Sequence, residues 1–192
     1  MVFKAKRRTV VTTAAAIFVL LVVGIVVSVV TSGSGAANAN ADMITFPAGH
    51  RPDAPDFTAT SLTGTPINFA SYRGKIVVLN VWGSWCGPCR GEATTLKYLD
   101  EQYGPQGIAF LGDDIQDTPT NALNFLSGHG ITYPSVNDAS GAVEERLAIA
   151  VPISGTPTTL VIDKTGHIAG MIDGPVTYPE FNTLLQDAKV TQ

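Results

Sequence analysis

Cysteine is scarce in this chain of 192 residues, which contains only Cys86 and Cys89. A structural zinc site is built from four ligands, and the sequence offers no second cysteine pair to complete one. The N-terminal region contains no cysteine, which excludes a lipoprotein anchored through that residue. The cysteine chemistry of this protein therefore rests on a single pair separated by two residues.

Acidic residues are absent from the first 41 positions, and the first one is Asp42. Four basic residues lie near the N-terminus: Lys4, Lys6, Arg7 and Arg8. When these four are set aside, 8 of the 12 Lys and Arg remain against 16 Asp and Glu, which gives a formal charge of −8. This excess of negative charge argues against nucleic acid as a partner.

Charge of either sign is missing from Val10–Val30. As a helix, this apolar run would span about 30 Å, which matches a bilayer core. The basic residues before it place that end in the cytoplasm and the rest of the chain outside. A cleaved signal peptide is the alternative, because 37–39 and 39–41 have the small-residue pattern of a cleavage site. The run is long for a signal peptide, so we favour a retained anchor over a protein secreted after cleavage.

These features divide the chain into four parts. We expect a cytoplasmic basic segment at 1–9, a transmembrane anchor at 10–30, a flexible linker at 31–46 and a folded domain at 47–192. The linker is assigned because its first residues, TSGSGAANAN, are small and polar and have little to bury. Arg7-Arg8 also permits a twin-arginine signal, although we prefer to interpret the pair as a generic basic flank.

The cysteine pair stands where a strand is expected to give way to a helix. An apolar run, Ile76–Val81, precedes the stretch WGSWCGPC, and a segment of helical spacing follows it. A C-x-x-C at such a junction is typical of reversible dithiol–disulfide chemistry. The unpaired N–H groups and the dipole of the helix N-terminus would stabilise a thiolate on Cys86, and the thiolate is the reactive form. Pro88 suits the first helical turn, where its missing N–H costs nothing.

The stretch WCGPC after the strand Val-Leu-Asn-Val-Trp resembles the thioredoxin superfamily, and most closely its extracytoplasmic TlpA/ResA-like branch. The resemblance extends over roughly 47–188 and includes Arg73–Lys75, Gly155–Thr159 and Ile162–Gly166. It implies a thioredoxin-like three-layer α/β sandwich, with a central mixed sheet, helices on both faces and an N-terminal β-hairpin extension. WCGPC is specific for this fold and much less specific for the direction of electron flow.

Local patterns predict the elements of this domain. Turn residues Leu62–Thr65 indicate a hairpin, and the β-branched run Lys75–Trp82 indicates a strand buried on both faces. Apolar positions at helical spacing predict a helix over Gly87–Gln102. A capping box beginning at Thr177 starts a last helix. Further strands are expected at 108–112, 133–138, 158–163 and 168–172, and further helices at 118–126 (ending at Gly128), 142–147 and 177–188.

Two positions bear on proton transfer between the cysteines. Thioredoxin carries a buried acid on the strand before its cysteines, whereas this chain has Asn80 there. Glu92 lies three residues after Cys89 and is therefore its neighbour on the helix surface. In the ResA-like proteins that the chain resembles, a glutamate at this spacing lies near the two sulfurs. We therefore expect Glu92 to take the place of the missing acid. The alternative is a solvated first-turn acid that favours the helix dipole.

The resemblance also implies the substrate-binding residues. It places a cis bond at Thr156–Pro157, against the disulfide, where the backbone of Thr156 can pair with an extended substrate segment. The alternative is an ordinary trans proline that begins a strand. Trp85, Gly87 and Pro88, which flank the cysteines, complete the expected contact surface.

Other polar residues are expected to have no catalytic role. Asp113-Asp114 follows an expected strand, and we interpret the pair as a solvated loop or helix cap rather than a cation site. His50, His129 and His167 lie in turn-like contexts without ligands at metal-binding spacing, so we interpret them as surface residues. No cofactor and no metal is expected.

The sequence predicts a membrane-tethered thiol–disulfide oxidoreductase outside the cytoplasm. Cys86 would attack a substrate disulfide, and Cys89 would resolve the mixed disulfide. The resemblance implies a reductase of protein disulfides, such as those of apocytochrome c during cytochrome c maturation, that receives its electrons from a membrane thiol carrier. A disulfide-forming oxidase remains the alternative.

Two further alternatives have less support. A peroxiredoxin-like peroxidase needs a threonine three residues before its reactive cysteine, and this chain has Gly83 there. A copper chaperone has a wider cysteine spacing and a histidine beyond the cis-proline region, for which His167 is the candidate.

Overall fold

A computed structural model describes residues 42–190. The predicted basic segment, the predicted transmembrane anchor and residues 31–41 of the predicted linker lie outside the described residues. Within 42–190, every helix is too short or too polar to be a bilayer-spanning segment.

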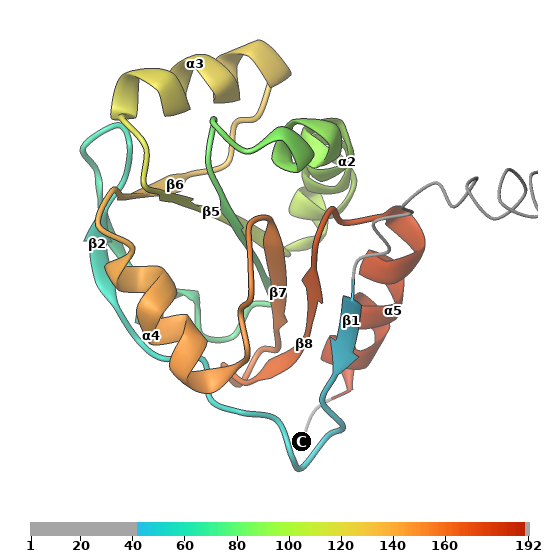
Figure 1. Cartoon of the computed structure of the whole chain (residues 1–192). Coiled ribbons are helices and arrows are strands. Elements are labelled where there is room, and N and C mark those ends of the chain that lie inside the picture. Colours follow the sequence, from blue (N-terminus) through green and yellow to red (C-terminus); the bar gives the residue numbers. More distant parts are fainter. Residues whose placement is uncertain (1–41, 191–192) are drawn as a thin grey trace, which may run out of the picture. The chain divides into compact units, whose positions relative to one another are not determined.

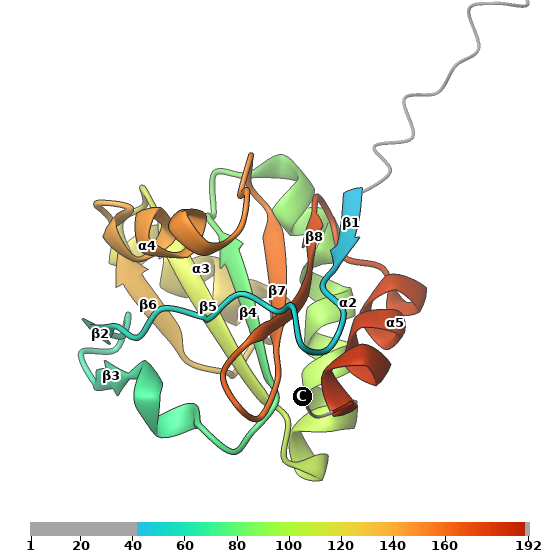
Figure 2. The ribbon, with the colours of Figure 1, turned by 90° about the horizontal axis from the view of Figure 1, so that it is seen from below.

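A mixed sheet of six strands forms the centre of the domain, in the order β1-β8-β7-β4-β5-β6 (Figures 1 and 2). Strand β4 runs parallel to β5 and antiparallel to β7, while β5 and β6 are parallel and β8 is antiparallel to both β7 and β1. This arrangement confirms the predicted mixed sheet. The strands are β1 (Asp42–Thr45), β4 (Val77–Trp82), β5 (Ala109–Ile115), β6 (Ser135–Asp138), β7 (Thr158–Ile162) and β8 (Ile168–Asp173).

The predicted hairpin is formed by β2 (Thr58–Thr60) and β3 (Pro66–Asn68), which pair antiparallel outside the main sheet. A 3-10 turn, Phe69–Tyr72, follows β3. The rings of Phe57 and Phe69, directly before β2 and after β3, stack 4.8 Å apart, and both are buried. The hairpin therefore contributes to a shared hydrophobic core.

Helices cover both faces of the sheet, as the sandwich predicts. They are α2 (Gly87–Tyr103), α3 (Pro119–His129), α4 (Ala142–Ala150) and α5 (Tyr178–Lys189). The apolar sides of α2, α3 and α5 pack on one face, and α4 packs on the other together with the hairpin. Every residue of β4 is buried, because this strand has a strand on each side and a packed layer on each face. Residues at its end are therefore held rigidly.

A buried arginine, Arg51, joins three distant segments at the end of the sheet where β4 begins and β7 ends. Nη1 of Arg51 lies 2.8 Å from Oδ2 of Asp163 and 2.9 Å from the carbonyl oxygen of Val190, and Nη2 donates to the carbonyl oxygen of Asp187 at 2.6 Å. Both members of the ion pair are almost fully buried. The last helix is thereby fixed to the β7–β8 turn and to the segment that follows β1.

The structure corrects three predicted boundaries. Strand β1 already begins at Asp42, within the predicted linker, because its backbone extends the sheet beside β8. Helix α3 continues past Gly128 to His129 and ends at Gly130, whose φ of 67° is the left-handed conformation that favours glycine after a helix. Strand β5 extends beyond Gly112 through the two aspartates. In each case the strand or helix includes residues that the sequence patterns had placed outside it.

Candidate active site

Cys86 and Cys89 form a disulfide of 2.04 Å at the junction of β4 and α2. Cys86 is the N-cap of α2, and its sulfur accepts a hydrogen bond from the backbone N–H of Cys89 at 3.1 Å. The helix N-terminus therefore directs an N–H group at this sulfur, as the sequence predicts. When the pair is reduced, the same donor would favour a thiolate on Cys86.

The loop before the cysteines is fastened to the end of β5. The indole N–H of Trp85 donates to the carbonyl oxygen of Ile115 at 3.1 Å, and the backbone N–H of Ser84 donates to Asp117 at 2.8 Å. Trp85 is nevertheless 52% exposed, so its ring remains available to a partner. A Cβ at Gly83 would lie 2.4 Å from the indole nitrogen of Trp85. The threonine that a peroxidase needs at this position would therefore displace the indole.

The Thr156–Pro157 peptide bond is cis, as the resemblance implies. The carbonyl oxygen of Thr156 lies 3.5 Å from Sγ of Cys86. Pro157 is buried, whereas Thr156 is half-buried, so a partner can reach its backbone. The structure thus brings the predicted substrate-binding loop against the sulfur that is predicted to attack.

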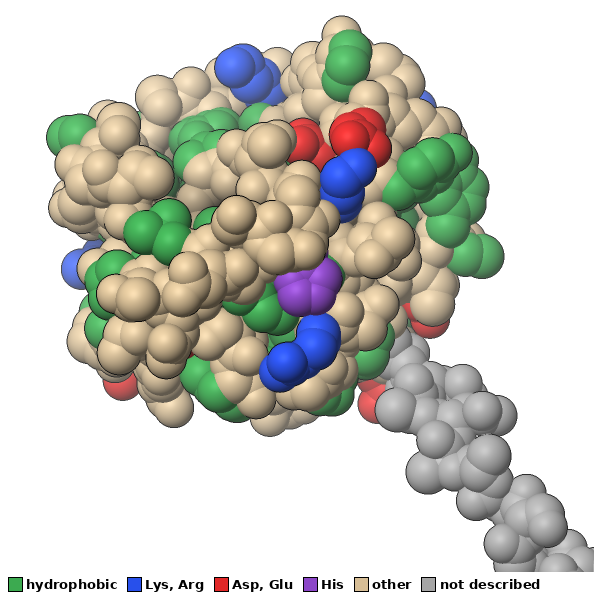
Figure 3. All heavy atoms as spheres, turned by 90° about the horizontal axis from the view of Figure 1, so that it is seen from above, with side chains coloured by type: hydrophobic (Ala, Val, Ile, Leu, Met, Phe, Trp, Pro, Cys, Tyr) green, Lys and Arg blue, Asp and Glu red, His purple; other side chains and the backbone are tan. Residues whose placement is uncertain are grey.

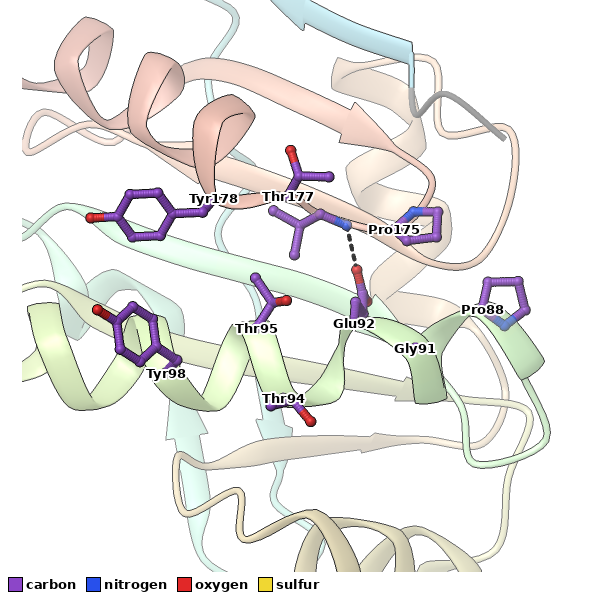
Figure 4. A pocket seen from close by; sticks show the side chains of 10 residues that line it. Pro88, Gly91, Glu92, Thr94, Thr95, Tyr98, Pro175, Thr177 and Tyr178 are labelled. Carbon is purple, nitrogen blue, oxygen red and sulfur yellow. Dashed lines mark hydrogen bonds between the residues drawn. The ribbon is translucent and has the colours of Figure 1, made fainter. Parts of the chain in front are cut away.

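Glu92 lies inside the domain rather than on its surface, with only 2% of it exposed. Nδ2 of Asn80 donates to one carboxylate oxygen at 2.9 Å. The backbone N–H of Val176 donates to the other at 2.7 Å, the contact that is dashed in Figure 4. Nδ2 of Asn80 also donates to the hydroxyl of Thr159 at 3.0 Å. The alternative of a solvated first-turn acid is wrong. Asn80 stands where thioredoxin has its acid, and here it holds a different acid in place.

Burial raises the pKa of Glu92 from its ordinary value of 4.5 to about 7, although the hydrogen bonds from Val176 and Asn80 lower it. A carboxyl group with this pKa is partly protonated and partly ionised at neutral pH. It can therefore both accept and return a proton under physiological conditions. Sequence spacing indicated the proximity of Glu92 to Cys89, but not this burial.

A cleft of about 870 Å³ opens beside Glu92 between α2 and the start of α5. Its walls run from Pro88, next to the cysteines, to Tyr98 and Tyr178 (Figure 4). The two tyrosine rings lie 6.1 Å apart. Glu92 is one of the residues that line the cleft, although only 2% of it is exposed. Sequence patterns did not indicate this cleft, because its two walls are far apart along the chain.

The end of the molecule at which β4 gives way to α2 is the upper end in Figure 1, and Figure 3 views the molecule from that side. Apolar side chains are scattered over this face and charged ones are sparse. A surface of this kind suits contact with a protein segment better than contact with a polyanion.

Asp113 and Asp114 are buried in β5, so their interpretation as a solvated loop or cap is wrong. They pair with Val81 and Trp82 of β4 and lie on opposite faces of the sheet. None of their four carboxylate oxygens has a hydrogen-bond partner among the described residues. Burial raises the pKa of Asp114 to about 8 and raises that of Asp113 well above its usual range. The only sequence sign of the longer strand was Ile115, an apolar residue directly after the pair.

His167 lies away from the cysteines. His167, in the β7–β8 turn, contacts Asp53 at 3.0 Å and the hydroxyl of Thr165 at 2.7 Å. This turn is at the opposite end of β7 from Pro157. The copper-chaperone alternative depended on His167, and this position does not support it.

Comparison with known proteins gives one consistent picture. The model of the AhpC/TSA family matches residues 51–171. The chain belongs to this family. It is 33% identical to the thiol–disulfide oxidoreductase ResA of Geobacillus thermodenitrificans over 71% of this chain and 76% of that one. The Bacillus subtilis ResA is 28% identical over 65% of this chain and 68% of its own length.

Solved structures agree with this assignment. A secreted thiol–disulfide isomerase from Corynebacterium glutamicum superposes with a TM-score of 0.71 and 29% identity, covering 81% of this chain and 96% of that one. A DsbF homologue from Corynebacterium diphtheriae gives a TM-score of 0.69 and 31% identity, covering 79% and 95%. With the Cys86–Cys89 disulfide, these relatives identify the AhpC/TSA family member described here as an extracytoplasmic thiol–disulfide oxidoreductase with a thioredoxin-like fold.

Proposed function

We propose that the protein is a membrane-tethered reductase of protein disulfides, in which Cys86 attacks, Cys89 resolves and Glu92 transfers the proton. The observation that supports this most directly is the buried carboxyl of Glu92, one helical turn from Cys89 and with a pKa of about 7. A resolving thiol must lose its proton before it can attack, and a nearby base of this strength can accept that proton at neutral pH.

The reaction begins with the reduced pair. The thiolate of Cys86 attacks one sulfur of a substrate disulfide, a Cys86–substrate disulfide forms, and the first substrate thiolate leaves. Cys89 then gives its proton to Glu92 and attacks the sulfur of Cys86. The Cys86–Cys89 disulfide forms, the second substrate thiolate leaves, and two electrons have passed from the protein to the substrate.

The surroundings of the cysteines are suited to a protein substrate. The half-buried backbone of Thr156 offers hydrogen bonds to an extended segment beside Cys86. Trp85 adds an exposed aromatic surface, and Gly87 and Pro88, between the two cysteines, are exposed as well. Disulfide-containing proteins are therefore the proposed substrates, with apocytochrome c as the candidate that the family resemblance suggests.

The proposed membrane attachment rests on Val10–Val30 and its basic flank. A reductase outside the cytoplasm works where disulfides form by default, so it needs a supply of electrons across the membrane. A membrane thiol carrier is the proposed donor. In sodium carbonate extraction, the full chain should stay with the membrane pellet. Release of a soluble species that begins near Ala39 or Asn40 would show signal cleavage instead.

The direction of electron flow is tested by the reduction potential of the Cys86–Cys89 couple, measured against glutathione or dithiothreitol buffers. The proposal predicts a value near that of thioredoxin, about −270 mV, at which the reduced pair donates electrons to most disulfides. A value near that of DsbA, about −120 mV, would indicate a disulfide-forming oxidase and refute the reductase.

Replacement of Glu92 by Gln keeps the shape of the side chain and removes its charge. In Glu92→Gln, Cys86 should ionise at a lower pH, because an anionic neighbour no longer opposes a second negative charge. Resolution by Cys89 should slow by about 100- to 10,000-fold, the scale that a positioned general base contributes. Thiol alkylation rates against pH, together with single-turnover disulfide reduction, measure both effects. Glu101→Gln, on the exposed side of the same helix, is the matched control.

Glu92→Gln should also change how the free energy of unfolding depends on pH. Because folding raises the pKa of Glu92, the protonated folded form is favoured, and the stability this confers is lost as the pH rises from about 4.5 to 7. Glu92→Gln should lack this share of the decline, while remaining within about 1 kcal/mol of the parent protein near pH 7.

If the thiol alkylation profiles of Glu92→Gln superimpose on those of the parent protein, Glu92 has no part in the mechanism.

A further inference from the structure

The loop that carries Thr156 is fastened to the sheet by one carboxylate, that of Asp173 at the end of β8. The hydroxyl of Ser154 donates to Oδ2 of Asp173. The hydroxyl of Thr158 lies 3.3 Å from Oδ1 of the same residue. Asp173 therefore contacts the chain on both sides of the Thr156–Pro157 pair.

Further bonds link the loop with the segment around Asp173. The backbone N–H of Gly174 donates to the carbonyl oxygen of Pro157 at 2.8 Å. The hydroxyl of Thr158 also donates to the carbonyl oxygen of Gly155 at 2.8 Å, which closes the loop on itself. Its single proton is thus shared between Gly155 and Asp173. The Ser154 contact is the one that ties the exposed beginning of the loop to β8.

We propose that Asp173 is the positioning residue of the substrate-binding loop, holding the backbone of Thr156 beside Cys86 so that it can pair with a protein segment. This inference rests on the proposed function, because it concerns the handling of protein substrates. Asp173 touches neither sulfur in the hydrogen bonds described, so it acts through the loop and not on the electrons. Its removal should weaken the capture of a protein disulfide and leave the intrinsic reactivity of the cysteines unchanged.

The chain supplies a matched control for charge. Asp42 lies directly opposite Asp173 in the β1–β8 register, is exposed, and is not among the hydrogen-bond partners of the loop. Asp42→Ala therefore removes the same charge from the same row of the sheet without disturbing the loop. Asp173→Asn is the conservative partner of Asp173→Ala. Its amide can accept from Ser154 and donate to the oxygen of Thr158, so it keeps the geometry while losing the charge.

The experiment compares insulin, a protein disulfide, with 5,5′-dithiobis(2-nitrobenzoic acid), a small disulfide that needs no backbone pairing. Turnover of insulin is driven by dithiothreitol, whereas the small disulfide, which dithiothreitol reduces directly, is mixed with the pre-reduced protein in a single turnover. Asp173→Ala should raise the KM for insulin about five- to tenfold, with kcat within about twofold, because a charged hydrogen-bond partner of the loop is lost. Its rate with the small disulfide should match that of the parent protein. Asp173→Asn and Asp42→Ala should both stay within about twofold of the parent on both substrates.

An unchanged KM for insulin in Asp173→Ala would overturn the proposal, as would an equal loss on both substrates. Loss of activity in Asp173→Asn would show that the loop depends on the charge of Asp173 and not on its hydrogen bonds, which would overturn the proposed role. Ser154→Ala, which removes a single contact from outside the sheet, gives the same test if Asp173→Ala does not fold.

Hydrogen exchange separates this proposal from the function on which it rests. Amides of residues 153–156 in the oxidised protein should exchange about tenfold faster in Asp173→Ala and at the parental rate in Asp173→Asn. If the parent protein fails to reduce insulin, the proposed function fails, and the exchange result still decides whether Asp173 positions the loop. Unchanged exchange in Asp173→Ala would refute it.

Discussion

The hydrogen bonds that hold the Glu92 carboxylate are the contact on which the active site depends. They join three parts of the fold: Asn80 on the central strand β4, Glu92 on α2, and Val176 in the turn before α5. Burying an ionised carboxylate without partners is costly, and both oxygens of Glu92 accept a hydrogen bond. The two donors keep the carboxyl in the interior, and the interior raises its pKa toward neutrality. The buried position of the Glu92 carboxyl and its raised pKa therefore both depend on these hydrogen bonds.

The rest of the site is arranged around the rigid end of β4. The strand is buried throughout, so Cys86 and the first turn of α2 have little freedom. Trp85 is tied to β5 on one side, and the Thr156 loop approaches from β7 on the other. The sulfur of Cys86 and the carboxyl of Glu92 are both positioned by α2, whereas the half-buried Thr156 precedes β7. Disulfide exchange requires these groups to keep their relative positions while the substrate binds and the product leaves.

The sequence specified those features that rest on local chemistry. The C-x-x-C pair after an apolar run identified the strand–helix junction, and the capping box located the last helix. The resemblance supplied the cis-proline loop and drew attention to Glu92. The spacing of Cys89 and Glu92 followed from helical geometry, because that relation lies within one element.

Relations between distant segments were beyond sequence reasoning. Asp113 and Asp114 were interpreted as solvated because acids are seldom buried without partners, yet the pairing of β5 with both neighbours carries them inside. Strand β1 was hidden because a short exposed edge strand has no burial pattern. Asp173 meets Ser154 across 19 residues, and only the folding of β7 against β8 brings the two together.

The central claim is that Glu92 is a buried carboxyl that titrates near neutral pH and senses the two sulfurs. Carbon-13 NMR of the glutamate side-chain carboxyls, with Glu92 assigned by comparison with Glu92→Gln, measures this directly. The account predicts an apparent pKa of about 7 in the oxidised protein. In the reduced protein it predicts a titration that shifts together with the ionisation of the thiols. A pKa near 4.5 in both redox states would contradict it.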